Sequence, residues 1–223
     1  SNPTGMVYSK AELQALADIC VKHDLYIIAD EIYQNLVYNG VEFVSIVSLG
    51  EEVKERTLLI NGVSKSYAMT GWRIGYCAAN KSLAKIMANY LSHSTGAPST
   101  ISQWAAVEAI NGPQDGVEVM RKAFDERRKH IVERINTIPG VSCLEPDGAF
   151  YVMMNIEKLI GKTLGGKLIE NDDDFAVALL EKALVAVVPC SGFGIKNFVR
   201  WSYAASMENI EKGLDRLEKF ITE

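Results

Sequence analysis

Helical and strand patterns alternate along the first half of this chain, and this alternation limits the fold more than any other feature of the sequence. Ser9 and Glu12 form a capping box in front of "AELQALADICVKH", whose apolar residues recur with helical spacing. The segment "LYIIAD" follows at once, a short apolar run that ends in an acid, which is typical of a buried parallel strand. "RTLLIN" and "RIGYCAA" repeat the strand pattern, and "KSLAKIMANYL" and "ISQWAAVEAI" the helical one. The sequence therefore predicts an α/β fold with a mostly parallel sheet.

The second half predicts a smaller unit that follows one long helix. Residues 116–136 carry many charges around a few apolar positions, which is typical of a half-exposed helix that joins two domains. Beyond Pro139, strand patterns in "GAFYVMMNI", "LVAVVP" and "NFVRWSYAA" alternate with helical patterns in "DDDFAVALLEKA" and after Ser206. We expect a first domain in residues 1–114, a linking helix in 115–138 and a small α/β domain in 139–223.

Charge and composition exclude several classes of function. The formal net charge of the 223 residues is -5 and the basic residues are scattered, so we expect no nucleic-acid partner. The apolar runs are too short to cross a bilayer and no signal segment is recognisable, so we expect no membrane partner and a cytoplasmic location. The cysteines and histidines show no metal-ligand spacing, and we interpret all four cysteines as buried thiols and expect no metal. They are Cys20, Cys77, Cys143 and Cys190.

Two ionisable residues lie at the ends of predicted strands. Asp30 ends "LYIIAD", and Lys65 comes just after "RTLLIN". Because open parallel sheets bind ligands beyond the carboxyl ends of their strands, both side chains are candidates for a site. Taken alone, the two residues could equally form a partly buried ion pair. Tyr33 follows Asp30 closely, and Ser64 and Arg73 add a hydroxyl and a forked cation suited to a phosphate, which favours a binding site.

Five motifs in order carry a resemblance to a known family. "NPTG", "ADEIYQNLVY", "SKSYAMTGWRIGY", "GAFY" and "FVRWSYA" resemble, in sequence and approximate spacing, the fold-type I aminotransferases that depend on pyridoxal phosphate, in particular their bacterial aspartate aminotransferase branch. The resemblance covers essentially the whole chain and implies the C-terminal part of such an enzyme. Residues 1–114 then correspond to the C-terminal part of the large cofactor-binding domain, and residues 139–223 to the small domain.

The resemblance implies a role for each residue around the cofactor. The amine of Lys65 holds pyridoxal phosphate as a Schiff base and, once freed by the substrate, moves a proton between substrate and cofactor. Asp30 pairs with the pyridine nitrogen and keeps it protonated. Tyr33 and Asn2 both donate hydrogen bonds to the phenolic oxygen, and Asn2 also lies in the substrate site.

The resemblance likewise assigns the anion-binding groups. Arg73 binds the phosphate, with Ser64 as the weaker candidate, while Gly62 stands where the family often has another hydroxyl. Arg200 of "FVRWSYA" binds the α-carboxylate of the substrate as a bidentate pair, although without the other motifs it would be interpreted as a surface residue. We interpret Tyr151 and the other aromatic residues beside these motifs as packing residues.

The function implied is transfer of an amino group from an L-amino acid, aspartate or glutamate first, to a 2-oxo acid by a homodimer. A β-lyase that uses pyridoxal phosphate on the same fold is the first alternative. The second is a catalytically silent fragment or interaction module, since the family's glycine-rich phosphate turn and stacking aromatic residue both precede "NPTG", the motif with which this sequence opens. We therefore expect residues 1–223 alone to be inactive. A Rossmann dehydrogenase is disfavoured because no GxGxxG follows a strand.

Overall fold

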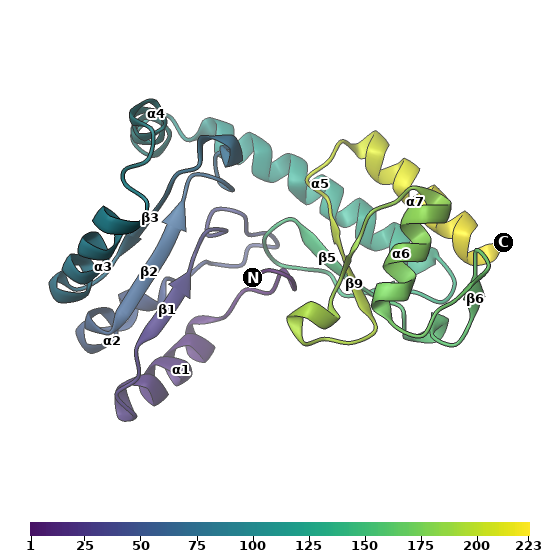
Figure 1. The fold of residues 1–223 in the computed structure, drawn as a ribbon, viewed down its shortest axis with the longest axis horizontal. Helices are drawn as coiled ribbons and strands as arrows, with labels where there is room; N and C mark the ends of the chain where they lie inside the picture. The colour runs from purple at the N-terminus through teal and green to yellow at the C-terminus, as the bar shows by residue number, and fades with distance from the viewer. The chain divides into compact units, whose positions relative to one another are not determined.

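The computed structural model describes residues 1–223 and divides them into two compact units (Figure 1). One unit comprises Val7–Met120, and the other comprises Ser1–Met6 together with Arg121–Glu223. The division falls within α5 (Asp115–Thr137), the long helix that residues 116–136 predict. No helix of the chain combines the length and the apolar character that crossing a bilayer requires.

The Val7–Met120 unit contains a three-stranded sheet in the order β1-β2-β3. Strands β1 and β2 are parallel, with Asp30 opposite Ile60, whereas β2 and β3 are antiparallel, with Gly62 opposite Gly75. The elements of this unit are α1 (Lys10–Lys22), β1 (Ile27–Asp30), the 3-10 helix η1 (Ile46–Leu49), α2 (Glu51–Glu55), β2 (Thr57–Gly62), η2 (Thr70–Trp72), β3 (Gly75–Ala78), α3 (Lys81–Ser94) and α4 (Thr100–Asn111).

Helix α1 forms as its sequence predicts and covers one face of the sheet. The capping box is confirmed, because the Glu12 amide donates to Ser9 Oγ at 3.3 Å and the Ser9 amide donates to Glu12 Oε2 at 2.8 Å. Ala17 is buried in a core cluster that also includes η1 and α2 residues, and Ile27 and Ala29 of β1 pack against that cluster. Alternate residues of β1 face the other way, so Ile28 is 72% exposed and Asp30 is exposed as well.

The prediction of a mostly parallel sheet is wrong, since this sheet is mixed and the four-stranded sheet of the other unit is antiparallel. A parallel connection needs a crossover, usually through a helix. Residues 31–56 supply one between β1 and β2, but residues 63–74 between β2 and β3 contain no helix longer than the three-residue 3-10 helix η2. The chain therefore reverses after β2, and β3 runs antiparallel.

Strand β3 also corrects the interpretation of the cysteines. All four are free thiols and Cys190 is fully buried, but Cys77 is exposed and Cys20 and Cys143 are half-buried. Every residue of β3 is exposed, and β3 is an edge strand of the sheet. An apolar setting in the sequence is thus no guarantee of burial at a sheet edge.

Gly62, at the end of β2, has no room for a side chain, and replacing it by alanine is expected to destabilise the protein by about 1 to 3 kcal/mol through overpacking. An added Cβ would lie 2.9 Å from the Ile74 carbonyl oxygen, 3.1 Å from Gly75 Cα and 3.2 Å from Ile32 Cδ1. Two of these atoms are backbone and cannot turn aside. Urea unfolding measures the loss, with Gly71→Ala as the control because nothing lies within 4 Å of its added Cβ. Equal stability of the two variants would contradict this packing argument.

The second unit is built around a four-stranded antiparallel sheet in the order β4-β5-β9-β8. In this sheet Met153 lies opposite Arg200 and Val152 opposite Trp201. Its elements, besides α5, are β4 (Ser142–Cys143), β5 (Tyr151–Asn155), η3 (Glu157–Leu159), β6 (Thr163–Leu164), β7 (Lys167–Leu168), α6 (Asp172–Ala183), β8 (Val188–Pro189), η4 (Ser191–Phe193), β9 (Phe198–Ser202) and α7 (Met207–Thr222).

The core of this unit joins the sheet to its helices. Helix α6 contacts both β9 and α7, and the rings of Phe175 and Phe220 lie 6.0 Å apart, edge to face. The last helix forms after Ser206 as predicted, and Ser206 caps it, since its Oγ accepts a hydrogen bond from the Asn209 amide. The predicted strand "LVAVVP" is shorter than expected because Leu184 ends α6 in the left-handed conformation (φ 55°).

Candidate functional site

Three chain segments bring the predicted cofactor-binding residues of the Val7–Met120 unit to one edge of the sheet. Asp30 ends β1, and Ser64 and Lys65 directly follow the end of the parallel strand β2. Arg73 lies just before β3, whose antiparallel direction returns the chain to the same edge with Gly75 beside Gly62. The reversal that the sequence did not predict is therefore what brings Arg73 back to the edge where Lys65 lies.

The segment around Lys65 packs on helix α4. Val63, Ile74 and Ala106 form a buried cluster, so the residues on both sides of the reversal pack on this helix. Ser66 is 2% exposed, whereas Lys65 stays half-buried with its Nζ 5.9 Å from the centre of the Tyr33 ring. The residues on either side of Lys65 are thus firmly packed, while its amine stays partly accessible, and this combination suits a reactive lysine.

The other polar groups of this edge differ in how they are held. Asp30 Oδ1 accepts a hydrogen bond from the Ile32 amide at 3.2 Å, which leaves acceptor capacity on an exposed carboxylate. Arg73 adopts the left-handed conformation (φ 54°), and its Nη1 donates to the Thr70 carbonyl at 2.8 Å. This bond uses one of the five guanidinium N–H groups, so the others can bind an anion.

Glu31 is a structurally important residue that sequence reasoning missed. It is 8% exposed, and its Oε1 accepts hydrogen bonds from Ser45 Oγ at 2.7 Å and from the Ile46 amide at 3.3 Å. Burial raises the pKa of Glu31, while the two hydrogen bonds oppose that shift. Its carboxylate ties the chain after Asp30 to the start of η1, and its signal in the sequence was a second acid at the end of a predicted strand.

Asn2 and Arg200 belong to the second unit, and there they contact each other. Arg200 Nη1 donates to Asn2 Oδ1. Because a guanidinium can only donate, this bond orients the amide, so that the Asn2 NH₂ group is left to donate elsewhere. Arg200 Nε is buried and has no hydrogen-bond partner in the chain. The pair therefore presents donors only, which fits an anionic or oxygen-bearing ligand.

Aromatic rings hold the Arg200 guanidinium in place. Its Cζ lies 4.3 Å from the centre of the Tyr151 ring and 5.4 Å from the centre of the Phe193 ring. Tyr151 is buried, so it packs as its interpretation from the sequence proposed, but one of the groups it packs against is the candidate ligand-binding arginine. Phe193 was not singled out in the sequence, where a residue in "SGFG" resembles an ordinary loop residue.

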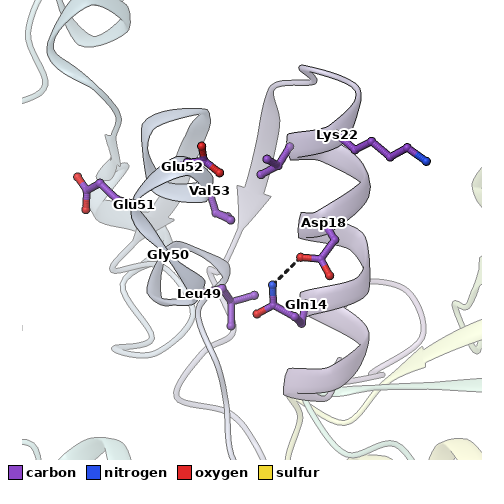
Figure 2. A pocket seen from close by; sticks show the side chains of 9 residues that line it. Gln14, Asp18, Lys22, Leu49, Gly50, Glu51, Glu52 and Val53 are labelled. Atoms are coloured by element: carbon purple, nitrogen blue, oxygen red, sulfur yellow. Dashed lines mark hydrogen bonds between the residues drawn. The ribbon is translucent and has the colours of Figure 1, made fainter.

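A separate cavity of about 350 Å³ lies between α1 and the η1–α2 segment (Figure 2). Its lining includes Asp18, which accepts a hydrogen bond from Gln14 at 2.8 Å, as well as Lys22, Glu51 and Glu52. None of the predicted site residues lines it. The cavity is thus distinct from the sheet edge that carries Lys65.

Comparisons with known proteins find aspartate aminotransferases among the relatives of this chain. An aspartate aminotransferase from Bacillus sp. (strain YM-2) is 48% identical over 221 residues, which are 99% of this chain and 55% of that protein. The crystal structure of an aspartate aminotransferase from Rhizobium meliloti covers 99% of the chain with a TM-score of 0.94 at 43% identity, over 56% of its own length. An aspartate aminotransferase from Thermus thermophilus with maleate covers 99% with a TM-score of 0.88 at 41% identity, over 55% of its own length.

The chain spans about half the length of the relatives it matches. Its match to a family extends nearly from end to end, since residues 1–217 match the family described as aminotransferase class I and II, whose members depend on pyridoxal phosphate. With the shared fold and with relatives close to half identical, this match identifies the chain as a member of the class I and II aminotransferases.

Proposed function

We propose that residues 1–223 form the C-terminal part of an enzyme that transfers an amino group from aspartate or glutamate to a 2-oxo acid. The observation that carries the proposal is that Asp30, Lys65 and Arg73 lie at one edge of the mixed sheet, in a chain that belongs to this family. We propose that the complete enzyme is a cytoplasmic homodimer. The relatives named aspartate aminotransferase support aspartate as the substrate.

The residues present fit pyridoxal phosphate. Lys65 offers one amine for its aldehyde, Asp30 a carboxylate for its ring nitrogen, and Tyr33 a hydroxyl for its phenolic oxygen. Arg73 and Ser64 offer donors for its phosphate. When bound, the cofactor supplies an electron sink for the bond broken at the substrate α-carbon. The cofactor ring withdraws electrons best when its nitrogen is protonated, and a carboxylate at that nitrogen, here Asp30, would keep it so.

The chain's own residues would bind the substrate and move its proton. The unpaired Nε of Arg200 and a Nη group form a fork that suits the α-carboxylate, while Tyr151 and Phe193 keep the fork from turning. Lys65 Nζ would accept the proton from the substrate α-carbon and deliver it to the carbon of the cofactor that carries the nitrogen. The Asn2 amide, fixed by Arg200, would donate to the phenolic oxygen.

The proposal is tested with the complete protein and added pyridoxal phosphate. Aspartate and 2-oxoglutarate are expected to yield oxaloacetate and glutamate faster than alanine or aromatic amino acids yield their own 2-oxo acids. Aspartate alone is expected to convert the bound cofactor to its amine form, because transamination proceeds in two half-reactions. Release of ammonia with an unchanged cofactor would instead support the β-lyase, and absence of cofactor binding would contradict the proposal. Light scattering tests the homodimer.

A further inference from the structure

Arg128 of α5 is a fully buried charge, which the pattern of residues 116–136 did not predict. Its side chain is 0% exposed, and it binds two carboxylates of different origin. Its Nη2 donates to Asp125 Oδ1 at 2.7 Å on the same helix, and its Nη1 donates to Glu145 Oε1 at 2.5 Å. Burial acts to lower the pKa of Arg128, but these partners raise it above its ordinary value, so the residue stays charged.

The second carboxylate belongs to a turn that Arg128 holds at two points. Nη1 of Arg128 also donates to the Pro146 carbonyl at 3.1 Å, so that one guanidinium fixes both a side chain and the backbone of the 145–148 turn. Just after the turn, Tyr203 Oη donates to the Ala149 carbonyl at 3.2 Å. A buried guanidinium that donates to two carboxylates and a backbone carbonyl allows little movement of its partners.

The 145–148 turn is in direct contact with the segment that carries Asn2. The Gly148 amide donates to the Gly5 carbonyl at 2.8 Å, and the Gly5 amide donates to the Ser1 carbonyl at 2.9 Å, which closes the turn of residues 1–5. Gly5 has φ 68°, and an added Cβ would overlap Pro146 Cβ and lie 2.9 Å from the Gly148 oxygen. The two turns therefore pack backbone to backbone with no room for a side chain.

We propose that Arg128 is a positioning residue, which holds the 145–148 turn and thereby sets the position of Asn2 and of the Arg200 guanidinium bonded to it. The path runs from Arg128 through the turn to Gly5 and then to Asn2. The hydrogen bonds of Arg128 described here go to Asp125, Glu145 and Pro146, so the influence that we propose on Asn2 and Arg200 is indirect. This inference rests on the proposed function, since it concerns the donor that Asn2 presents to the cofactor and the fork that Arg200 presents to the substrate.

The test uses Arg128→Met in the complete protein loaded with pyridoxal phosphate, with two readouts besides turnover. The first is the pH midpoint of the cofactor's visible absorbance change, which should rise by about 0.5 pH unit because a displaced Asn2 donates less well to the phenolic oxygen. The second is the dissociation constant of maleate, a dicarboxylate that is not turned over. It should increase about tenfold, by analogy with the partners that orient metal ligands.

Two control variants separate positioning from general loss of stability. Arg134→Met removes an arginine of the same helix whose partners, Glu211, Asp215 and Glu218, lie on α7 and not in the turn. Leu214→Ala removes a fully buried side chain of α7 and should destabilise the protein through the cavity that it leaves. Neither control should change the midpoint or the maleate constant.

A fourth variant, Gly5→Ala, disturbs the same path from its other end and leaves Arg128 intact. It should shift both readouts in the same direction as Arg128→Met, and it keeps the test decisive if the latter fails to fold. The proposal is overturned if Arg128→Met, or Gly5→Ala in its place, matches the controls in both readouts while the wild-type protein binds cofactor and maleate. If the wild-type protein binds neither, the proposed function fails first and this inference with it.

Discussion

Replacing Lys65 by alanine in the complete protein is expected to lower kcat for transamination about 10⁴-fold, since we propose that this one residue is both the covalent anchor and the proton carrier. The lysine lies on a firmly packed segment, with Val63 and Ser66 buried on either side of it. No other amine of the predicted site could replace it. Single-turnover absorbance measurements with aspartate determine the rate directly.

The same residue is tested by chemical trapping. Borohydride reduction of the wild-type protein, followed by peptide mapping, should place the cofactor on Lys65. Lys54→Ala is the matched control, because Lys54 is an exposed lysine of the same unit that pairs only with Glu51 in α2, and its loss should leave kcat unchanged. A trapped cofactor on another lysine, or a Lys65→Ala variant with normal kcat, would refute the assignment.

Arg200→Lys is expected to cost about 2 to 4 kcal/mol in kcat/KM for aspartate, with little change in cofactor affinity. A lysine keeps the positive charge but loses the planar fork and its stacking on Tyr151, so the bidentate contact that we propose with the α-carboxylate would be lost. Steady-state kinetics over a range of amino acids measures this loss, and absorbance titration measures the cofactor affinity.

Arg216→Lys is a suitable control for this substitution. Arg216 lies in the same unit and donates to the Leu184 carbonyl at 3.2 Å, away from the predicted site residues, so its replacement should leave kcat/KM unchanged. If Arg200→Lys retained normal kcat/KM for every amino acid tried, Arg200 would have no part in substrate binding.

Several parts of the fold could be predicted because their causes lie within a few neighbouring residues. The capping box of α1 needs only Ser9 and Glu12, and α6 spans "DDDFAVALLEKA" as its periodicity indicates. The hairpin of β6 and β7 was missed, although its signal was equally local. Gly165 and Gly166 both have positive φ, and a Gly-Gly pair between two short strands is typical of a tight two-residue turn.

What only the tertiary structure decided depends on segments that are distant in the sequence. The direction of β3, the complete burial of Arg128 and the bond between Asn2 and Arg200, 198 residues apart, have no local signal. Periodicity and capping motifs depend only on residues that are close together in the sequence. Which strand reverses, and which charge finds buried partners, is determined by the packing of whole elements, and a linear pattern does not contain it. The sequence by itself thus determined which elements form and which residues are candidates for chemistry, whereas the tertiary structure decided which of them meet.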